Sequence, residues 1–257
     1  MIKFFRHIRR TLINQNQMGK YFKYAIGEIL LVVIGILIAL QINNWNEVRK
    51  TRNLELHYLT NIKRDLNMNI AHLDDYIDRR EKAIASANSI LEHYEGKPVT
   101  NYKEFGFKAV DIYTWRKFFQ INNTFQELTN SGNLALISND SIKSTLLNLE
   151  TLYKVMKDQE AHFRYDAEIL LYEPSYNTLD LNALVKNYTY KVTNGMMGDQ
   201  REFNKEEYEL MLKDKKQKNG FVMATYEFGA MNGQFRRMKL MCQDLITLID
   251  KELDQDD

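Results

Sequence analysis

The chain has 257 residues, which is enough for one or two domains. It carries 35 Lys and Arg against 34 Asp and Glu, and this balance excludes a uniformly basic nucleic-acid binder. The single cysteine excludes an internal disulfide and a cysteine-rich metal site.

The N-terminal segment, residues 1–20, is basic, and no acidic residue precedes Glu28. Apolar side chains at Ile2, Phe5 and Ile8 share one face of a helix over residues 2–14. We expect this amphipathic helix to lie on the cytoplasmic leaflet. Its cations would contact anionic lipid: Lys3, Arg6, Arg9 and Arg10.

Residues 21–44 predict a transmembrane helix. Nearly every residue from Ile29 to Ile42 is Ile, Leu or Val, which favours the bilayer by roughly 4–5 kcal/mol on an insertion scale. The stretch from Tyr24 to Ile42 approaches the ~20 residues that cross the hydrocarbon layer. Aromatic residues at both ends are typical interface anchors: Tyr21, Tyr24 and Trp45.

The basic flank sets the expected orientation. Short basic flanks stay in the cytoplasm, so we expect the N-terminus there and the chain from about Asn44 onward outside. A cleaved signal peptide is the competing interpretation, because it also has a basic head and an apolar core. No clean small-x-small cleavage site follows, since bulky Leu37 stands two residues before Ala39. The sequence therefore favours an uncleaved anchor.

One side of the span predicts an association face. Five residues lie near one line along the helix at about 100° per residue: Glu28, Gly35, Ala39, Ile42 and Asn46. The pair Gly35-x-x-x-Ala39 permits close helix contact in lipid. We therefore predict helix association beside an intramembrane carboxylate. The alternative is a glycine that lipid tolerates and a Glu28 side chain that reaches the headgroups.

Residues 45–257 predict a helical-bundle domain. No glycine or proline occurs between Gly35 and Gly96, so we expect the transmembrane helix to continue as a stalk helix over residues 45–94. Lys63 and Arg80 are polar exceptions to an apolar seam of heptad spacing. The seam consists of Leu59, Leu66, Ile70, Leu73, Ile77, Ile84, Ala87, Leu91 and Tyr94.

Short helices are expected over residues 102–131, the first of them over 102–121. Thr124-x-x-Glu127 predicts a capping box for the second, and Gly132 its end.

A long helix is expected next, over residues 140–172, after a cap in "SNDS". Its seam contains Ile142, Leu146, Leu149, Tyr153, Met156, Phe163, Ala167 and Leu170. Residues 173–205 show little periodicity and predict a loop, with a short strand at "YTYKV".

The terminal helix, residues 218–254, has the clearest pattern. Together these elements predict an all-α fold in which long helices share the core of an antiparallel bundle. Cys242 lies in the seam and is expected to be a small buried residue and not a nucleophile. The seam residues are Phe221, Ala224, Phe228, Met231, Phe235, Met238, Cys242, Leu245 and Ile249.

Candidate chemistry is sparse. His72 and Asp75 stand one helical turn apart and supply half of a possible metal site. The alternative is a solvated face on which Asp75 pairs with Arg79. No phosphate loop, nucleophile elbow or paired-cysteine motif occurs, and Ser131 belongs to a turn. We predict no catalytic residue, cofactor or metal.

Two stretches carry a family resemblance. They are "YAIGEILLVVIGILIALQINNWNE", which follows the basic "MIKFFRHIRR", and "TFQELTNSGNLALISNDSIKSTL". With them the sequence resembles a family of uncharacterised membrane proteins from Bacteroidota, domain of unknown function 6090. The resemblance covers most of the chain and implies a source and a membrane location, but no chemistry. It would make the outer side the periplasm.

The sequence thus predicts a non-enzymatic, single-pass inner-membrane protein whose periplasmic bundle binds a partner or acts as a scaffold. The expected partners are membrane lipid and either a second copy or another membrane protein, not nucleic acid. One alternative is a subunit of an ion-driven or transport assembly that uses Glu28 as a protonatable group. Another is a helical ligand sensor, which would signal through a membrane partner.

Overall fold

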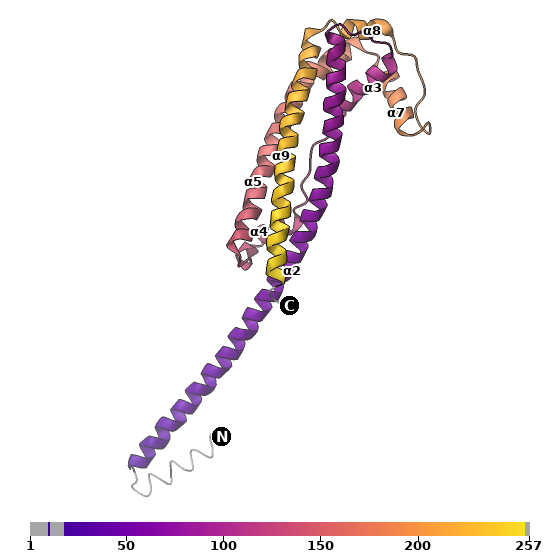
Figure 1. Ribbon diagram of the computed structural model, residues 1–257. Coiled ribbons are helices and arrows are strands. Elements are labelled where there is room, and N and C mark those ends of the chain that lie inside the picture. The colour runs from indigo at the N-terminus through magenta and orange to yellow at the C-terminus, as the bar shows by residue number, and fades with distance from the viewer. Residues whose placement is uncertain (1–9, 11–17, 255–257) are drawn as a thin grey trace. The chain divides into compact units, whose positions relative to one another are not determined.

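Figure 1 shows a computed structural model of the chain, which describes residue 10 and residues 18–254. The described residues form helices and no strand, which confirms the all-α class. The chain divides into two compact units, residues 1–57 and residues 58–257. Most of the predicted basic helix, with Lys3, Arg6 and Arg9, lies outside the described residues.

Helix α2 (Met18–Tyr94) is unbroken over 77 residues, as the lack of internal glycine and proline from Gly35 to Gly96 predicts. Within the first unit its large apolar side chains from Ile29 to Ile42 are all 44–64% exposed. This helix is the one candidate membrane span among the described residues, although a signal sequence near the N-terminus has the same length and composition.

The second unit contains the rest of α2 and all the later helices. These are α3 (Tyr102–Tyr113), α4 (Asn123–Asn130), the 3₁₀-helix η1 (Asn133–Leu136), α5 (Asp140–Ala167), the π-helix η2 (Glu168–Tyr172), α6 (Glu173–Thr178), α7 (Leu181–Val192), α8 (Lys205–Met211) and α9 (Lys215–Leu253). Side by side in Figure 1, α2, α5 and α9 form the body of the bundle.

Helix α9 is antiparallel to α2. Lys63 Nζ of α2 lies 2.5 Å from Asp250 Oδ1 near the C-terminal end of α9. Further along, Lys239 Nζ lies 2.6 Å from Asp74 Oδ1. Because the residue numbers fall on α9 as they rise on α2, the two helices run in opposite directions.

Helix α9 is also antiparallel to α5. The Asn139 amide before α5 donates to Glu252 at 2.8 Å, and Gln159 donates to Glu227 at 3.1 Å. Helices α2 and α5 are therefore parallel to each other. The chain between them has to return along the bundle before α5 can begin.

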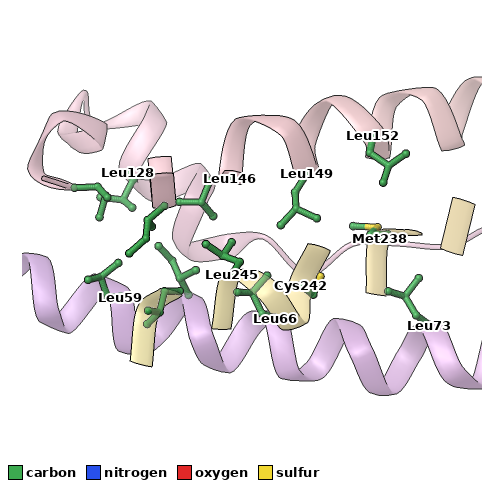
Figure 2. Close-up of a cluster of buried hydrophobic side chains, with 14 of the residues drawn as sticks. Leu59, Leu66, Leu73, Leu128, Leu146, Leu149, Leu152, Met238, Cys242 and Leu245 are labelled. Atoms are coloured by element: carbon green, nitrogen blue, oxygen red, sulfur yellow. The ribbon is translucent and has the colours of Figure 1, made fainter. Parts of the chain in front are cut away.

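The predicted seams form the core of the second unit. All nine predicted seam residues of α9 are at most 1% exposed, which confirms that helix face. Burial raises the pKa of the Cys242 thiol to about 12, so the role of Cys242 as an apolar core residue is confirmed. Figure 2 shows side chains of the three long helices meeting in this core: Leu59, Leu66, Leu73, Leu146, Leu149, Leu152, Met238, Cys242 and Leu245.

The helix predicted over residues 102–121 was wrong beyond Tyr113, where α3 ends. The capping box was also wrong, because Asn122 is the N-cap of α4 and the Thr124 hydroxyl donates to Asp65. A tertiary contact therefore replaces the local cap. The end of this short helix is confirmed, since Gly132 follows it with a left-handed φ of 73°.

The loop predicted over residues 173–205 was wrong for the stretch that forms α6 and α7, although residues 193–204 are without helix or strand as predicted. The predicted strand was also wrong, because "YTYKV" is the end of α7. Asp180 caps α7 by accepting from the backbone N–H groups of Asn182 and Ala183. Asn187 is fully buried. Its side-chain amide nitrogen donates to the Arg201 carbonyl oxygen, and its amide oxygen accepts from the Arg201 N–H. These contacts fix a helix whose apolar pattern is too short to predict it.

Two glycines of α9 provide a test of this packing. A Cβ at Gly220 would lie 2.6 Å from Leu171 Cδ2 and 2.9 Å from the Leu170 carbonyl oxygen, whereas one at Gly229 would meet nothing within 4 Å. Gly220→Ala should therefore lower the free energy of unfolding, and Gly229→Ala should raise it by about 1 kcal/mol through helix propensity. Urea unfolding followed by circular dichroism measures both changes, and equal changes of the same sign would contradict the packing.

Candidate functional site

The predicted membrane face lies on α2 within the first unit. A Cβ at Gly35 would meet nothing within 4 Å, so this face is open in the described structure. Tyr24 and Trp45 are exposed, and the side chain of Tyr21 lies outside the described part of the chain. Association through the face stays a prediction: Glu28, Gly35, Ala39, Ile42 and Asn46.

The second unit contains a buried polar network that the sequence did not predict. Its centre is residues 114–122, here called the return segment, which connects α3 to α4 without helix or strand. Phe118 anchors the segment in the core at 1% exposure. A segment of this kind makes no regular hydrogen bonds of its own, so its buried N–H and C=O groups need other partners.

Near the end of the return segment, α2 supplies these partners. Asn69 donates to the Ile121 carbonyl oxygen at 2.6 Å and accepts from the Ile121 N–H at 2.7 Å. Asp65 accepts from both the backbone N–H and the hydroxyl of Thr124, at 3.1 and 2.8 Å. Two buried polar side chains of α2 therefore hold the entry to α4.

In the middle of the segment the partners come from both parallel helices. Tyr76 Oη of α2 donates to the Lys117 carbonyl oxygen at 2.7 Å. On α5, Glu160 accepts from the Phe118 N–H at 2.8 Å, and Lys157 donates to the Phe118 carbonyl oxygen at 3.2 Å. The return segment is thus hydrogen-bonded to α2 and α5.

Arg80 is the most deeply buried cation of this network, at 4% exposure. Its Nη2 donates to the Arg116 carbonyl oxygen at 3.2 Å and to Glu160 at 3.3 Å. Burial lowers the pKa of Arg80 to about 10, so the guanidinium is still charged at neutral pH. Its Nε and Nη1 are shielded from solvent and have no hydrogen-bond partner among the residues that the structure describes.

Aromatic rings surround the same guanidinium. The Cζ of Arg80 lies 5.0 Å from the ring centre of Phe228, 5.1 Å from that of Phe235 and 5.5 Å from that of Trp115. Cation–π attraction at these distances offsets part of the lost hydration. The rings thus make it possible to bury a charge that Glu160 alone compensates poorly at 3.3 Å.

A pocket of about 260 Å³ lies against Arg80. Residues of α2, the end of α3 and the start of the return segment line it, with Tyr188 of α7 and Phe228 of α9. Its charged lining comprises three carboxylates and four cations: Asp75, Asp78, Asp111, Arg79, Arg80, Lys82 and Arg116.

Two of these carboxylates already have cationic neighbours on α2. Arg79 Nε lies 2.7 Å from Asp75 and Lys82 Nζ lies 2.6 Å from Asp78. The hydrogen bond from Arg79 holds the pKa of Asp75 below its ordinary value. The predicted pairing of Asp75 with Arg79 is therefore confirmed. No group of three His, Cys, Asp or Glu side chains that could hold a metal ion occurs within the described residues.

A larger pocket, of about 420 Å³, lies where α3, α6 and α7 meet. Several of its hydroxyl groups already pair with protein atoms. Tyr113 Oη lies 2.8 Å from Ser175 Oγ, and Tyr172 Oη donates to the Tyr113 carbonyl oxygen at 2.9 Å. The pocket beside Arg80 is the stronger candidate site, because its wall contains an unsatisfied buried donor.

One residue of this site was visible in the sequence. Arg80 interrupts the predicted seam of α2 as a polar exception. Glu160 interrupts the seam of α5 in the same way, between Met156 and Phe163, and it was missed. A polar residue at a core position of two different helices is the pattern that points to a buried pair.

One comparison with known proteins matches the chain. The model of a family of unknown function, DUF6090, matches residues 28–182, which is more than half of the sequence. The match covers the return segment and the pocket residues of α2 and α3. No curated protein and no solved structure matches.

Removing the charge of Glu160 tests the buried pair. Glu160→Gln keeps an acceptor for the Phe118 N–H but leaves the Arg80 cation without a counter-charge, so it should lower the free energy of unfolding by about 3 kcal/mol. Urea unfolding of the full chain in detergent measures this. Glu168→Gln is the matched control, because Glu168 pairs with Arg164 at the surface and should matter little. Similar losses in both variants would contradict the assignment.

Proposed function

The chain belongs to the DUF6090 family of unknown function, and from this premise we propose that it is a non-enzymatic, membrane-anchored scaffold protein. Residues 21–44 cross the inner membrane with the N-terminus in the cytoplasm. The helical unit of residues 58–257 lies in the periplasm, where it binds a partner protein. The chain associates with a second copy through the face that contains Gly35 and Ala39.

The exposed apolar helix is the observation that carries the membrane assignment. Soluble monomers rarely expose an apolar patch of more than a few hundred Å². Here every large apolar side chain from Ile29 to Ile42 is more than two-fifths exposed, and none of the most apolar stretch is buried. The hydrocarbon core of a bilayer is the favourable environment for a helix that is apolar on all sides.

The outer face of α9 supports partner binding. Val222, Tyr226 and Leu240 are 44–69% exposed on this helix, on the side away from its core seam. Gly229 and Gly233 lie in the same stripe, with open space where a Cβ would stand. An aromatic residue among exposed apolar and small ones is typical of protein interfaces.

Membrane fractionation tests the anchor. Full-length protein made in a Gram-negative host should stay in the membrane pellet after an alkaline carbonate wash and dissolve only in detergent. Protease added to spheroplasts should digest the C-terminal unit, because we place it in the periplasm. Release by carbonate, or protection from protease in intact spheroplasts, would contradict the location or the orientation.

A paired substitution provides the control. Val33→Arg with Ile36→Arg places two cations near the middle of the span, at about 2.5–3.5 kcal/mol each, which exceeds the roughly 4–5 kcal/mol that favours insertion. This variant should leave the membrane fraction. Its circular dichroism should remain helical, since residues 58–257 are unchanged.

Crosslinking in native membranes tests self-association. Gly35→Leu with Ala39→Leu should reduce the crosslinked dimer several-fold, because the added side chains separate the helices. Val33→Leu lies on the opposite side of α2 and should leave the dimer unchanged. Equal dimer yields in the two variants would show that this face makes no contact between copies.

A further inference from the structure

Arg80 lines the pocket and leaves part of its hydrogen-bonding capacity unused. Its Nη2 already has two acceptors, whereas Nε and Nη1 have none. Both nitrogens are shielded from bulk water, and neither has an acceptor among the described residues. A buried donor without an acceptor destabilises a fold, which makes a bound acceptor favourable.

The aromatic rings do not remove this requirement. Cation–π contacts cover the faces of a guanidinium, while its N–H groups point outward in the guanidinium plane. Trp115, Phe228 and Phe235 surround the cation, but a ring is a much weaker acceptor than an oxygen. The natural acceptor for an arginine edge is a carboxylate or a phosphate.

We propose that the pocket beside Arg80 binds a small monocarboxylate between the guanidinium groups of Arg80 and Arg116. This inference does not depend on membrane anchoring, because all the residues involved lie within residues 58–257.

Arg116 is the second cation of the site. It lies on the return segment, and its carbonyl oxygen accepts from Arg80, so the two arginines are adjacent. Its exposed side chain lines the pocket, and no salt bridge joins it to an acidic group in the described part of the chain. The other two cations of the lining, Arg79 and Lys82, are already paired on α2.

The carboxylates of the lining select the charge of the ligand. Asp75 and Asp78 each have a cationic neighbour, but within the described part of the chain Asp111 accepts only from the Ser86 hydroxyl, at 2.9 Å. This charge opposes a dianion more strongly than a monoanion, so phosphate binds less well than a carboxylate. The apolar part of the ligand packs against aromatic lining residues such as Tyr76 and Tyr188.

Tryptophan fluorescence measures binding directly. The chain has two tryptophans, and Trp45→Phe leaves Trp115, which lines the pocket, as the single reporter. Full-length protein in detergent is titrated with sodium propionate at constant ionic strength, with sodium chloride as the blank and sodium phosphate as the dianion. We expect a saturable change with propionate and at least about tenfold weaker binding of phosphate.

Neighbouring residues of the return segment provide matched variants. Arg116→Gln should weaken propionate binding about tenfold or more, as the loss of a charge-assisted hydrogen bond requires. Lys117→Gln makes the same charge change at the next residue, which is outside the pocket lining, and should leave binding unchanged. Circular dichroism checks that both variants fold.

Three results would overturn the proposal. They are the absence of a saturable response, phosphate binding as tight as that of propionate, and equal weakening by Arg116→Gln and Lys117→Gln. The first would indicate that water binds the unused donors of Arg80. Either of the other two would show that the fluorescence response to propionate reflects general charge screening and not a specific site.

Discussion

Helices α2 and α5 run in the same direction, so the chain between them has to cross the length of the bundle in the opposite sense. Helix α3 covers the first part of this path, and the return segment continues it without helical hydrogen bonds, so its backbone needs partners in the interior. Asn69, Tyr76 and Arg80 provide them from α2, while Lys157 and Glu160 provide them from α5. The burial of Asn69, Arg80 and Glu160 is explained by this requirement, since each of them bonds to a backbone atom of the return segment.

At Arg80 this requirement is opposed by the cost of burying a charge. A neutral donor would satisfy the Arg116 carbonyl oxygen, but arginine also brings a charge into the core, where desolvation opposes it. Glu160, Trp115, Phe228 and Phe235 compensate that charge through one ion pair and three ring contacts. The arrangement is structurally incomplete, because two nitrogens lack acceptors. Natural proteins usually satisfy such groups, which is why an incomplete arrangement beside a pocket is informative about a ligand.

Sequence periodicity predicted the parts of the fold that depend on one helix at a time. The seam of α9 is sustained over its whole length, so every predicted member is buried. The return segment could not be predicted, because its aromatic residues favour burial in any conformation and its partners lie 36 to 52 residues away in the sequence. For the same reason the sequence indicated one residue of the site but not its partner. Arg80 stood out as polar within an apolar seam, but nothing local pairs it with Glu160, 80 residues further on.

Helix α2 combines two apolar patterns that suit two solvents. From Ile29 to Ile42 apolar side chains occupy all sides, whereas from Leu59 to Tyr94 they occupy one side and charges such as Asp74 and Glu81 occupy the others. An all-round apolar surface is unfavourable in water, and a one-sided helix in lipid would place many charges in hydrocarbon. The change falls at Asn43–Glu47, where polar residues flank Trp45 while the helix continues unbroken. An unbroken helix without a small-x-small site supports a retained anchor over a cleaved signal peptide, and so supports the proposal that the bundle is tethered to a membrane.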